Sequence, residues 1–215
     1  MALIWLPCSA STPSSAAATV TPIAYRCCVA IAAIDPTSQI GAIGRFDTEG
    51  ATRRFAIDSL SMALSGHLWR LLAPAVAETT DSGTVLSPLR LESVDGSGAV
   101  TVAGTLPGET PGRLRLDAYG LDLRDLAGVL RGDTTGMSGY VGADLEIAGT
   151  RQAPVIQGTV SLGDAVFGDF RAPFIQGILH YEDRRLEGNL SIWKTGQRIL
   201  GIEVALPLDL ALAPV

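Results

Sequence analysis

Residues 139–150 read GYVGADLEIAGT, and within them Val141, Ala143, Leu145 and Ile147 alternate with polar or small residues. Because successive side chains of a β-strand point to opposite faces, this period of two predicts a strand with one apolar and one polar face. The same alternation continues on both sides of this stretch. It runs through residues 156–162, 186–192 and 200–206 downstream, and through Leu89/Leu91, Val100/Val102 and Leu114/Leu116 upstream.

Turn-forming residues separate these runs. Examples are Asp95-Gly96-Ser97-Gly98, Pro107-Gly108, Pro111-Gly112, Gly163-Asp164, Glu182-Asp183 and Thr195-Gly196. Links of a few residues cannot make parallel crossovers, so we expect neighbouring strands to pair antiparallel. The predicted fold class is mainly all-β: a long antiparallel meander, curled into an open groove, with one short helix.

The helix is predicted over Leu121–Leu130, which reads LDLRDLAGVL. Its Leu123, Leu126, Ala127 and Leu130 share one helical face, and Arg131-Gly132 follows as a stop signal. We expect this amphipathic helix to pack over one end of the apolar face as a cap.

An internal repeat marks the second half of the chain. Ala153-Pro-Val-Ile-Gln-Gly158 recurs as Ala172-Pro-Phe-Ile-Gln-Gly177, 19 residues further on. A proline at the first residue of a strand loses no ladder hydrogen bond, and the glycine leaves room for a facing side chain or a close backbone. A repeat of this size indicates a sheet built by stacking similar units.

The first forty residues differ from the rest. Residues 1–20 are rich in Ala, Ser, Thr and Pro, and they lack the basic region that precedes the apolar core of a signal peptide. All three cysteines fall within the first 28 residues, so the remaining chain uses no disulfide or thiolate metal site. We expect residues 1–40 to be a disordered or non-native segment and residues 41–215 to form the β-sheet domain.

Composition excludes several classes of protein. With 47% hydrophobic and 18% charged residues, the chain is too apolar to be intrinsically disordered over most of its length. A net charge of −6 argues against a nucleic-acid partner, because such binders gather Lys and Arg against phosphate. No run of about 18 uncharged apolar residues predicts a transmembrane helix.

The sequence offers no positive sign of an enzyme. The two histidines, His67 and His180, lie in strand-like runs, and no nucleophile elbow, HExxH motif or Cys/His cluster occurs. Asp164 and Asp169 flank a glycine-rich loop, but two carboxylates cannot supply the six to eight oxygen ligands of calcium. We expect no catalytic residue, no metal site and no cofactor.

The apolar face of the predicted strands has to be shielded from water. One short helix cannot cover it, so the face must meet a second sheet, its own far side after curling, or an apolar ligand. We expect eight residues to line one continuous interior that acyl chains can enter. They are Leu145, Ile147, Val160, Leu162, Leu190, Ile192, Val204 and Leu206.

The glycine-led strand 139–150 with its Gly149-Thr150 end, followed by Ala153–Gly158, resembles the repeats of the TamB/AsmA-like family. His67–Leu71, Pro88–Leu91 and residues 100–106 fit the upstream strands of that family, so the resemblance covers roughly residues 45 to 212. It implies a bridge-like lipid transfer protein of the bacterial envelope, anchored at the inner membrane and reaching across the periplasm.

The resemblance also implies partners. They are phospholipid acyl chains and, through the full-length protein, an Omp85-type outer-membrane barrel that assembles outer-membrane proteins. Because no N-terminal anchor is recognisable and the last residues follow a strand directly, we expect an internal fragment. The alternative is a β-rich structural interaction module with a closed dry core and no lipid conduit.

Overall fold

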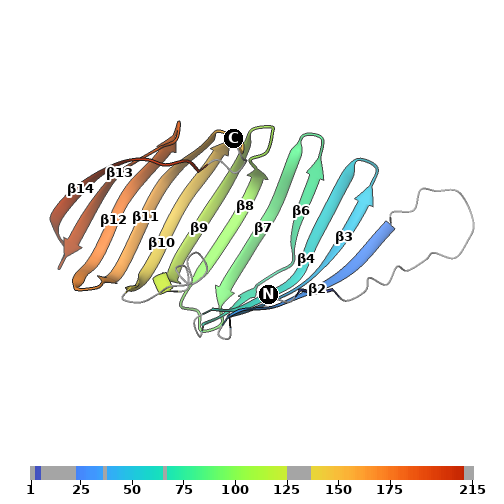
Figure 1. The fold of residues 1–215 in the computed structure, drawn as a ribbon, viewed down its shortest axis with the longest axis horizontal. Helices are drawn as coiled ribbons and strands as arrows, with labels where there is room; N and C mark the ends of the chain where they lie inside the picture. The colour runs from blue at the N-terminus through green and yellow to red at the C-terminus, as the bar shows by residue number, and fades with distance from the viewer. Residues whose placement is uncertain (1–2, 6–22, 36–37, 65–66, 125–136, 211–215) are drawn as a thin grey trace, which may run out of the picture.

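The computed structural model describes residues 3–5, 23–35, 38–64, 67–124 and 137–210, which form one antiparallel sheet (Figure 1). Its 14 strands are β1 (Leu3–Trp5), β2 (Ile23–Asp35), β3 (Ser38–Glu49), β4 (Thr52–Leu64), β5 (His67–Leu71), β6 (Ala75–Thr80), β7 (Gly83–Ser93), β8 (Ala99–Leu106), β9 (Gly112–Asp122), β10 (Met137–Gly149), β11 (Pro154–Phe167), β12 (Phe170–Glu182), β13 (Arg185–Lys194) and β14 (Gln197–Pro207). The predicted all-β antiparallel meander is confirmed.

Strands follow one another across the sheet in chain order, with one exception. Strands β5 and β6 both lie between β4 and β7, and together they occupy a single strand position. The interruption between them contains Pro74, which has no N–H to donate to the ladder. The rest of the sheet is a meander of neighbouring hairpins.

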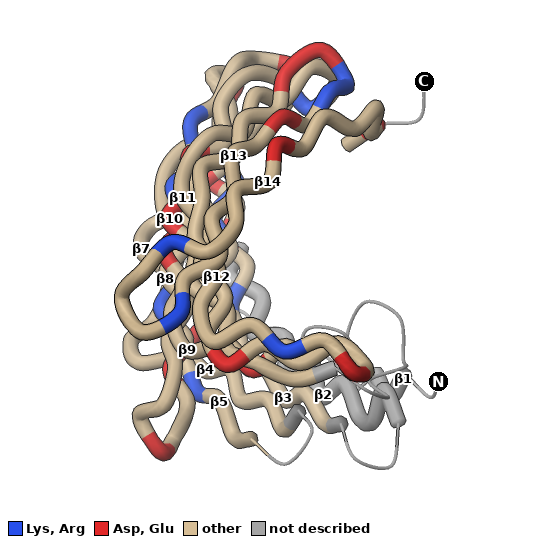
Figure 2. The backbone as a smooth tube through the Cα atoms, turned by 90° about the vertical axis from the view of Figure 1, so that its left-hand side faces the viewer, with Lys and Arg blue, Asp and Glu red and all other residues tan. Residues whose placement is uncertain are grey.

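In side view the sheet is bent into a C (Figure 2). Curvature of this kind lets side chains on the inner face converge, while those on the outer face spread apart. Along β13 the exposure alternates accordingly, with Leu186, Leu190 and Ile192 half-buried or buried and Glu187 and Asn189 exposed. The alternation predicted from the sequence is therefore present in the folded sheet.

The structure differs from the prediction at the N-terminal boundary. Strand β2 lies within the segment expected to be outside the fold, and it pairs with β3 from Ile23↔Thr48 to Asp35↔Ser38. The sheet therefore begins before Gly41. Small residues such as Ala24, Ala30 and Ala32 hide the period of two in this strand, because they blur the contrast between apolar and polar positions. Residues 6–22 lie outside the described residues.

The predicted start of the helix at Leu121 is also wrong. Residues Leu121 and Asp122 belong to β9, where they pair with Val141 and Tyr140 of β10. Residues 125–136, which hold most of the predicted helix, lie outside the described residues, so the cap remains a prediction. Asp122 is buried and pairs with Arg124 at 2.6 Å, and the hydrogen bond from Arg124 lowers the pKa of this carboxyl.

The two repeat glycines bring neighbouring backbones close together. A Cβ at Gly158 would collide with the Asp144 carbonyl of β10, and a Cβ at Gly177 would collide with the Asn189 carbonyl of β13. Gly158 also has a φ of +152°, a conformation that side chains disfavour. The expected close approach of backbone at these positions is thus present in both copies of the repeat.

The turn between β7 and β8 is held by one carboxylate. Asp95 Oδ1 accepts hydrogen bonds from Ser93 Oγ at 2.7 Å, from Ser97 Oγ at 2.7 Å and from the Ser97 N–H at 3.0 Å. These bonds, that from Ser93 foremost, lower the pKa of Asp95 from its ordinary 3.8 to about 2.

We predict that Asp95 makes the fold sensitive to acid. Because its folded-state pKa is depressed, its stabilising effect is present above about pH 4 and disappears as the pH falls toward about 2. Asp95→Asn should unfold at a lower temperature than the wild type at pH 7, and this gap should narrow as both proteins are taken to pH 2. Circular dichroism melts across this range would measure it, and a constant gap would contradict the assignment.

Candidate functional site: the concave apolar face

Cross-strand register aligns mainly aliphatic residues of β10 to β14, together with three glycines and Tyr181, in four rows on one face of the sheet. Directly paired residues of an antiparallel sheet share a face, so each row runs across five strands. The rows are Val141–Leu162–Ile175–Ile192–Leu200, Ala143–Val160–Gly177–Leu190–Ile202, Leu145–Gly158–Leu179–Gly188–Val204 and Ile147–Ile156–Tyr181–Leu186–Leu206. We call these residues the concave apolar face.

This face lies inside the opening of the C. The segment that follows β14 lies within the opening in Figure 2, and its Leu210 N–H donates to the Tyr181 hydroxyl at 2.9 Å. Tyr181 belongs to the same row as Ile156 and Leu186 and is 2% exposed. The apolar rows therefore line the inner side of the bend.

All eight residues predicted to line the interior lie on the concave apolar face. The register places Leu162 and Ile192 in one row, Val160 and Leu190 in the next, Leu145 and Val204 in the third, and Ile147 and Leu206 in the fourth. The structure thus brings them together as a surface. Their role in binding lipid stays a prediction.

The rows continue toward the middle of the sheet. Leu145 pairs with Leu116 of β9, which pairs with Val102 of β8 and, through it, with Leu89 of β7. A second line joins Ala143 to Ala118, Val100 and Leu91. The apolar face consequently extends beyond the eight predicted residues, over at least eight strands from β7 to β14.

Burial varies along the face. Ala165, Ala172 and Ile192 form a small buried cluster, with Leu162 and Ile175 packed against it. On β14 the rows end in side chains that are far more accessible: Leu200 is 51% exposed and Leu206 is 52% exposed. One part of the face therefore acts as core, while the part along β14 is open.

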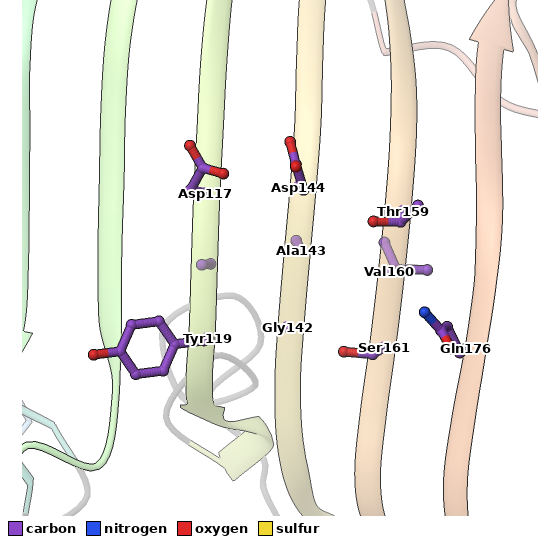
Figure 3. A pocket seen from close by; sticks show the side chains of 10 residues that line it. Asp117, Tyr119, Gly142, Ala143, Asp144, Thr159, Val160, Ser161 and Gln176 are labelled. Atoms are coloured by element: carbon purple, nitrogen blue, oxygen red, sulfur yellow. The ribbon is translucent and has the colours of Figure 1, made fainter.

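The opposite, polar face carries a shallow depression that sequence reasoning missed. It has a volume of about 350 Å³ and lies over Gly142, where the absence of a side chain leaves room between neighbouring strands. Figure 3 shows its lining side chains on β9, β10, β11 and β12. They include Asp117, Tyr119, Asp144, Thr159, Ser161 and Gln176.

A guanidinium beside this depression joins its two carboxylates. Arg115 contacts Asp117 and Asp144 at 3.1 Å each, and the hydrogen bond to Asp117 raises the pKa of Arg115 above its ordinary value. Because Asp117 and Asp144 pair directly across β9 and β10, the arrangement depends on register. The sequence shows the alternation of polar residues within each strand, but it does not show that these two carboxylates are neighbours.

His180 lies at the surface beside a carboxylate. His180 Nε2 lies 3.3 Å from Glu182 Oε2 on the polar face, and both side chains are well exposed. Within the described ranges, no group of three or more His, Cys, Asp or Glu side chains could hold a metal ion. Among the same residues, no helix has the length and apolar character needed to cross a membrane.

Comparison of the chain with protein-family models, with curated proteins and with solved structures finds no match. The resemblance to the TamB/AsmA-like family therefore remains a prediction carried by the repeat motifs.

Proposed function

We propose that this chain is a segment of a periplasmic envelope-biogenesis protein of the TamB/AsmA-like kind. Its concave apolar face carries phospholipid acyl chains between the inner and outer membranes, and the full-length protein, anchored at the inner membrane, supports outer-membrane protein assembly with an Omp85-type barrel. The observation that supports this proposal is the alignment of aliphatic rows across β7 to β14 on the inner side of the bend.

Such a face suits the transport of acyl chains better than their tight capture. Burial of apolar surface gains roughly 25 cal/mol per Å², and the attraction has no preferred direction. A buried methylene group gains about 0.8 kcal/mol wherever it lies along the rows. An acyl chain can therefore move from row to row at nearly constant free energy, because no single contact holds it.

Photo-crosslinking tests the proposal directly. A photoreactive residue at Leu162 in β11 or at Leu190 in β13 reports on the concave apolar face. One at Ser191, next to Leu190 in β13, reports on the polar face. In cells or with phospholipid vesicles, we expect covalently attached phospholipid at Leu162 and Leu190 and background labelling at Ser191. Equal labelling at all three positions, or none at any, would overturn the proposal.

We predict that charges in the second row block lipid contact. Val160→Asp combined with Leu190→Asp places two carboxylates among the aliphatic side chains, where an acyl chain would have to pass them unpaired. Lipid labelling at Leu162 should fall at least about tenfold, by the free-energy cost of a buried charge. The control Glu187→Ser lies on the polar face of β13 and should leave labelling unchanged.

The buried cluster of Ala165, Ala172 and Ile192 favours the second candidate function in part, because there the face packs as core. In that reading the chain is a structural β-rich interaction module with a closed dry core. An apolar fluorophore separates the two candidates: an open face should bind it and brighten it, whereas a closed core should leave its emission unchanged. Loss of stability without loss of lipid labelling in the double variant would favour the structural module.

A further inference from the structure

Strand β14 is the last strand that the structure describes, and its outer edge has no partner among the described residues. Every one of its 11 residues is exposed except Val204, which is half-buried. Between Gln197 and Leu206 it contains no proline and no lysine, the residues that commonly protect an edge. A long edge of this kind presents unpaired N–H and C=O groups to another strand.

The segment after β14 turns away from this edge. The Leu208 N–H donates to the Arg184 carbonyl at 2.9 Å, and the Leu210 N–H donates to the Tyr181 hydroxyl. Both acceptors lie inward of β14, in the turn before β13 and in β12. Through Leu210 the chain therefore crosses the concave side, and no described residue pairs with the outer edge of β14.

We propose that a second copy of this chain pairs with β14 through this edge. The two β14 strands run antiparallel about a two-fold axis at Ile202. In this register Ile202 meets Ile202 of the second copy, Leu200 meets its Val204, and Gly201 meets its Glu203. A two-fold axis perpendicular to the sheet keeps the concave apolar faces of the two copies on the same side.

Charge complementarity on the polar face selects this register. The Arg198 guanidinium folds over Gly201, where it occupies the space that a side chain would fill. Neither Arg198 nor Glu203 forms an ion pair within the part of the chain that the structure describes. Since directly opposed positions lie about 5 Å apart, Glu203 of one copy reaches the guanidinium above Gly201 of the other.

The neighbouring two-fold registers lack this match. Pairing about Glu203 would place two carboxylates directly opposite each other, which destabilises a strand pair. Pairing about Gly201 would place Glu203 against Ile199, whose side chain is 57% exposed and apolar. Pairing about Ile202 forms two ion pairs by symmetry and continues the rows of Leu200 and Val204 into the second copy.

Sedimentation of the purified chain tests this pairing, and it does so independently of lipid. We expect a concentration-dependent dimer. Glu203→Arg alone and Arg198→Glu alone should each raise the dimer dissociation constant at least about tenfold, because each creates two like-charge contacts. The double variant Arg198→Glu with Glu203→Arg restores both ion pairs and should dimerise like the wild type. Dimerisation that is equal in all four proteins, or a monomer at every concentration, overturns the proposal.

Disulfide trapping checks the register. In a chain whose three native cysteines are replaced by serine, Ile202→Cys places two thiols at the two-fold axis, within the Cα separation that a disulfide allows. It should give a covalent dimer on mild oxidation. Ala205→Cys should not, because the two copies of this position lie about 20 Å apart along the strands in the proposed register. Trapping at position 205 but not at position 202 overturns the register. Trapping at Ile202 with no lipid labelling at Leu190 would retain the dimer and refute only the proposed function.

Discussion

Replacing Gly158 by alanine should lower the free energy of unfolding by about 3 kcal/mol. The new Cβ would collide with the Asp144 carbonyl oxygen and would lie 2.9 Å from the Leu145 Cα. Both atoms belong to the backbone of β10, so relief requires β10 and β11 to separate locally. The φ of +152° adds strain that only glycine avoids.

Gly163→Ala is the matched control, because it lies in the same strand with no atom within 4 Å of the added Cβ. Alanine there should leave stability within about 1 kcal/mol of the wild type, since it reduces only the freedom of the unfolded chain. Urea unfolding followed by circular dichroism would compare the two variants. If both variants lower the urea midpoint by the same amount, contact of the added Cβ with the backbone of β10 is not the cause of the lost stability at Gly158.

Ile192→Asp should be as damaging, for a different reason. Ile192 is 4% exposed and packs with Ala165 and Ala172, so a carboxylate there would be buried without a partner. We expect a loss of about 3–4 kcal/mol in unfolding free energy. Ser191→Asp, one residue earlier and on the polar face, should change stability by no more than about 0.5 kcal/mol.

A second substitution in the row of Ile192 distinguishes buried core from open surface. Leu200 lies directly opposite Ile192 on β14 and is 51% exposed. Leu200→Asp should cost less than about 1 kcal/mol, because water can still reach the charge. Chemical unfolding of Ile192→Asp and Leu200→Asp measures this difference. Equal losses would mean that the whole row is core, which would favour the structural module over a lipid-carrying face.

The strands themselves could be predicted from the sequence wherever the apolar positions are large. Leu145, Leu162 and Leu190 each stand among polar neighbours, and all three lie in strands. Strand β2 was missed because its alternate positions include alanine, which gives little contrast in hydrophobicity. Leu121 was assigned to a helix because its neighbours share a helical period, whereas in the sheet it pairs with Val141 of β10. At Leu121, pairing with a strand that is distant in the sequence outweighs the helical periodicity of the neighbouring residues.

The candidate face was predictable in its membership but not in its geometry. Alternation within a strand says which residues share a face of that strand, and short turns keep neighbouring strands in register. Asp117 and Asp144 both line the depression over Gly142 although they are 27 positions apart in the chain, and only the register of β9 against β10 brings these carboxylates together. Nothing within either strand specifies that pairing.

By itself the sequence determined the antiparallel order of the strands and the residues on each apolar face, because both follow from local period and from links too short for a crossover. Tertiary structure alone decided that the apolar face lies inside the bend, that Ile192 is core while Leu200 is open, and that none of the described residues pairs with the outer edge of β14. These properties depend on how the whole sheet curves and on which segment crosses which strand. They are set by contacts between distant residues, such as Leu210 with Tyr181, that no local pattern records.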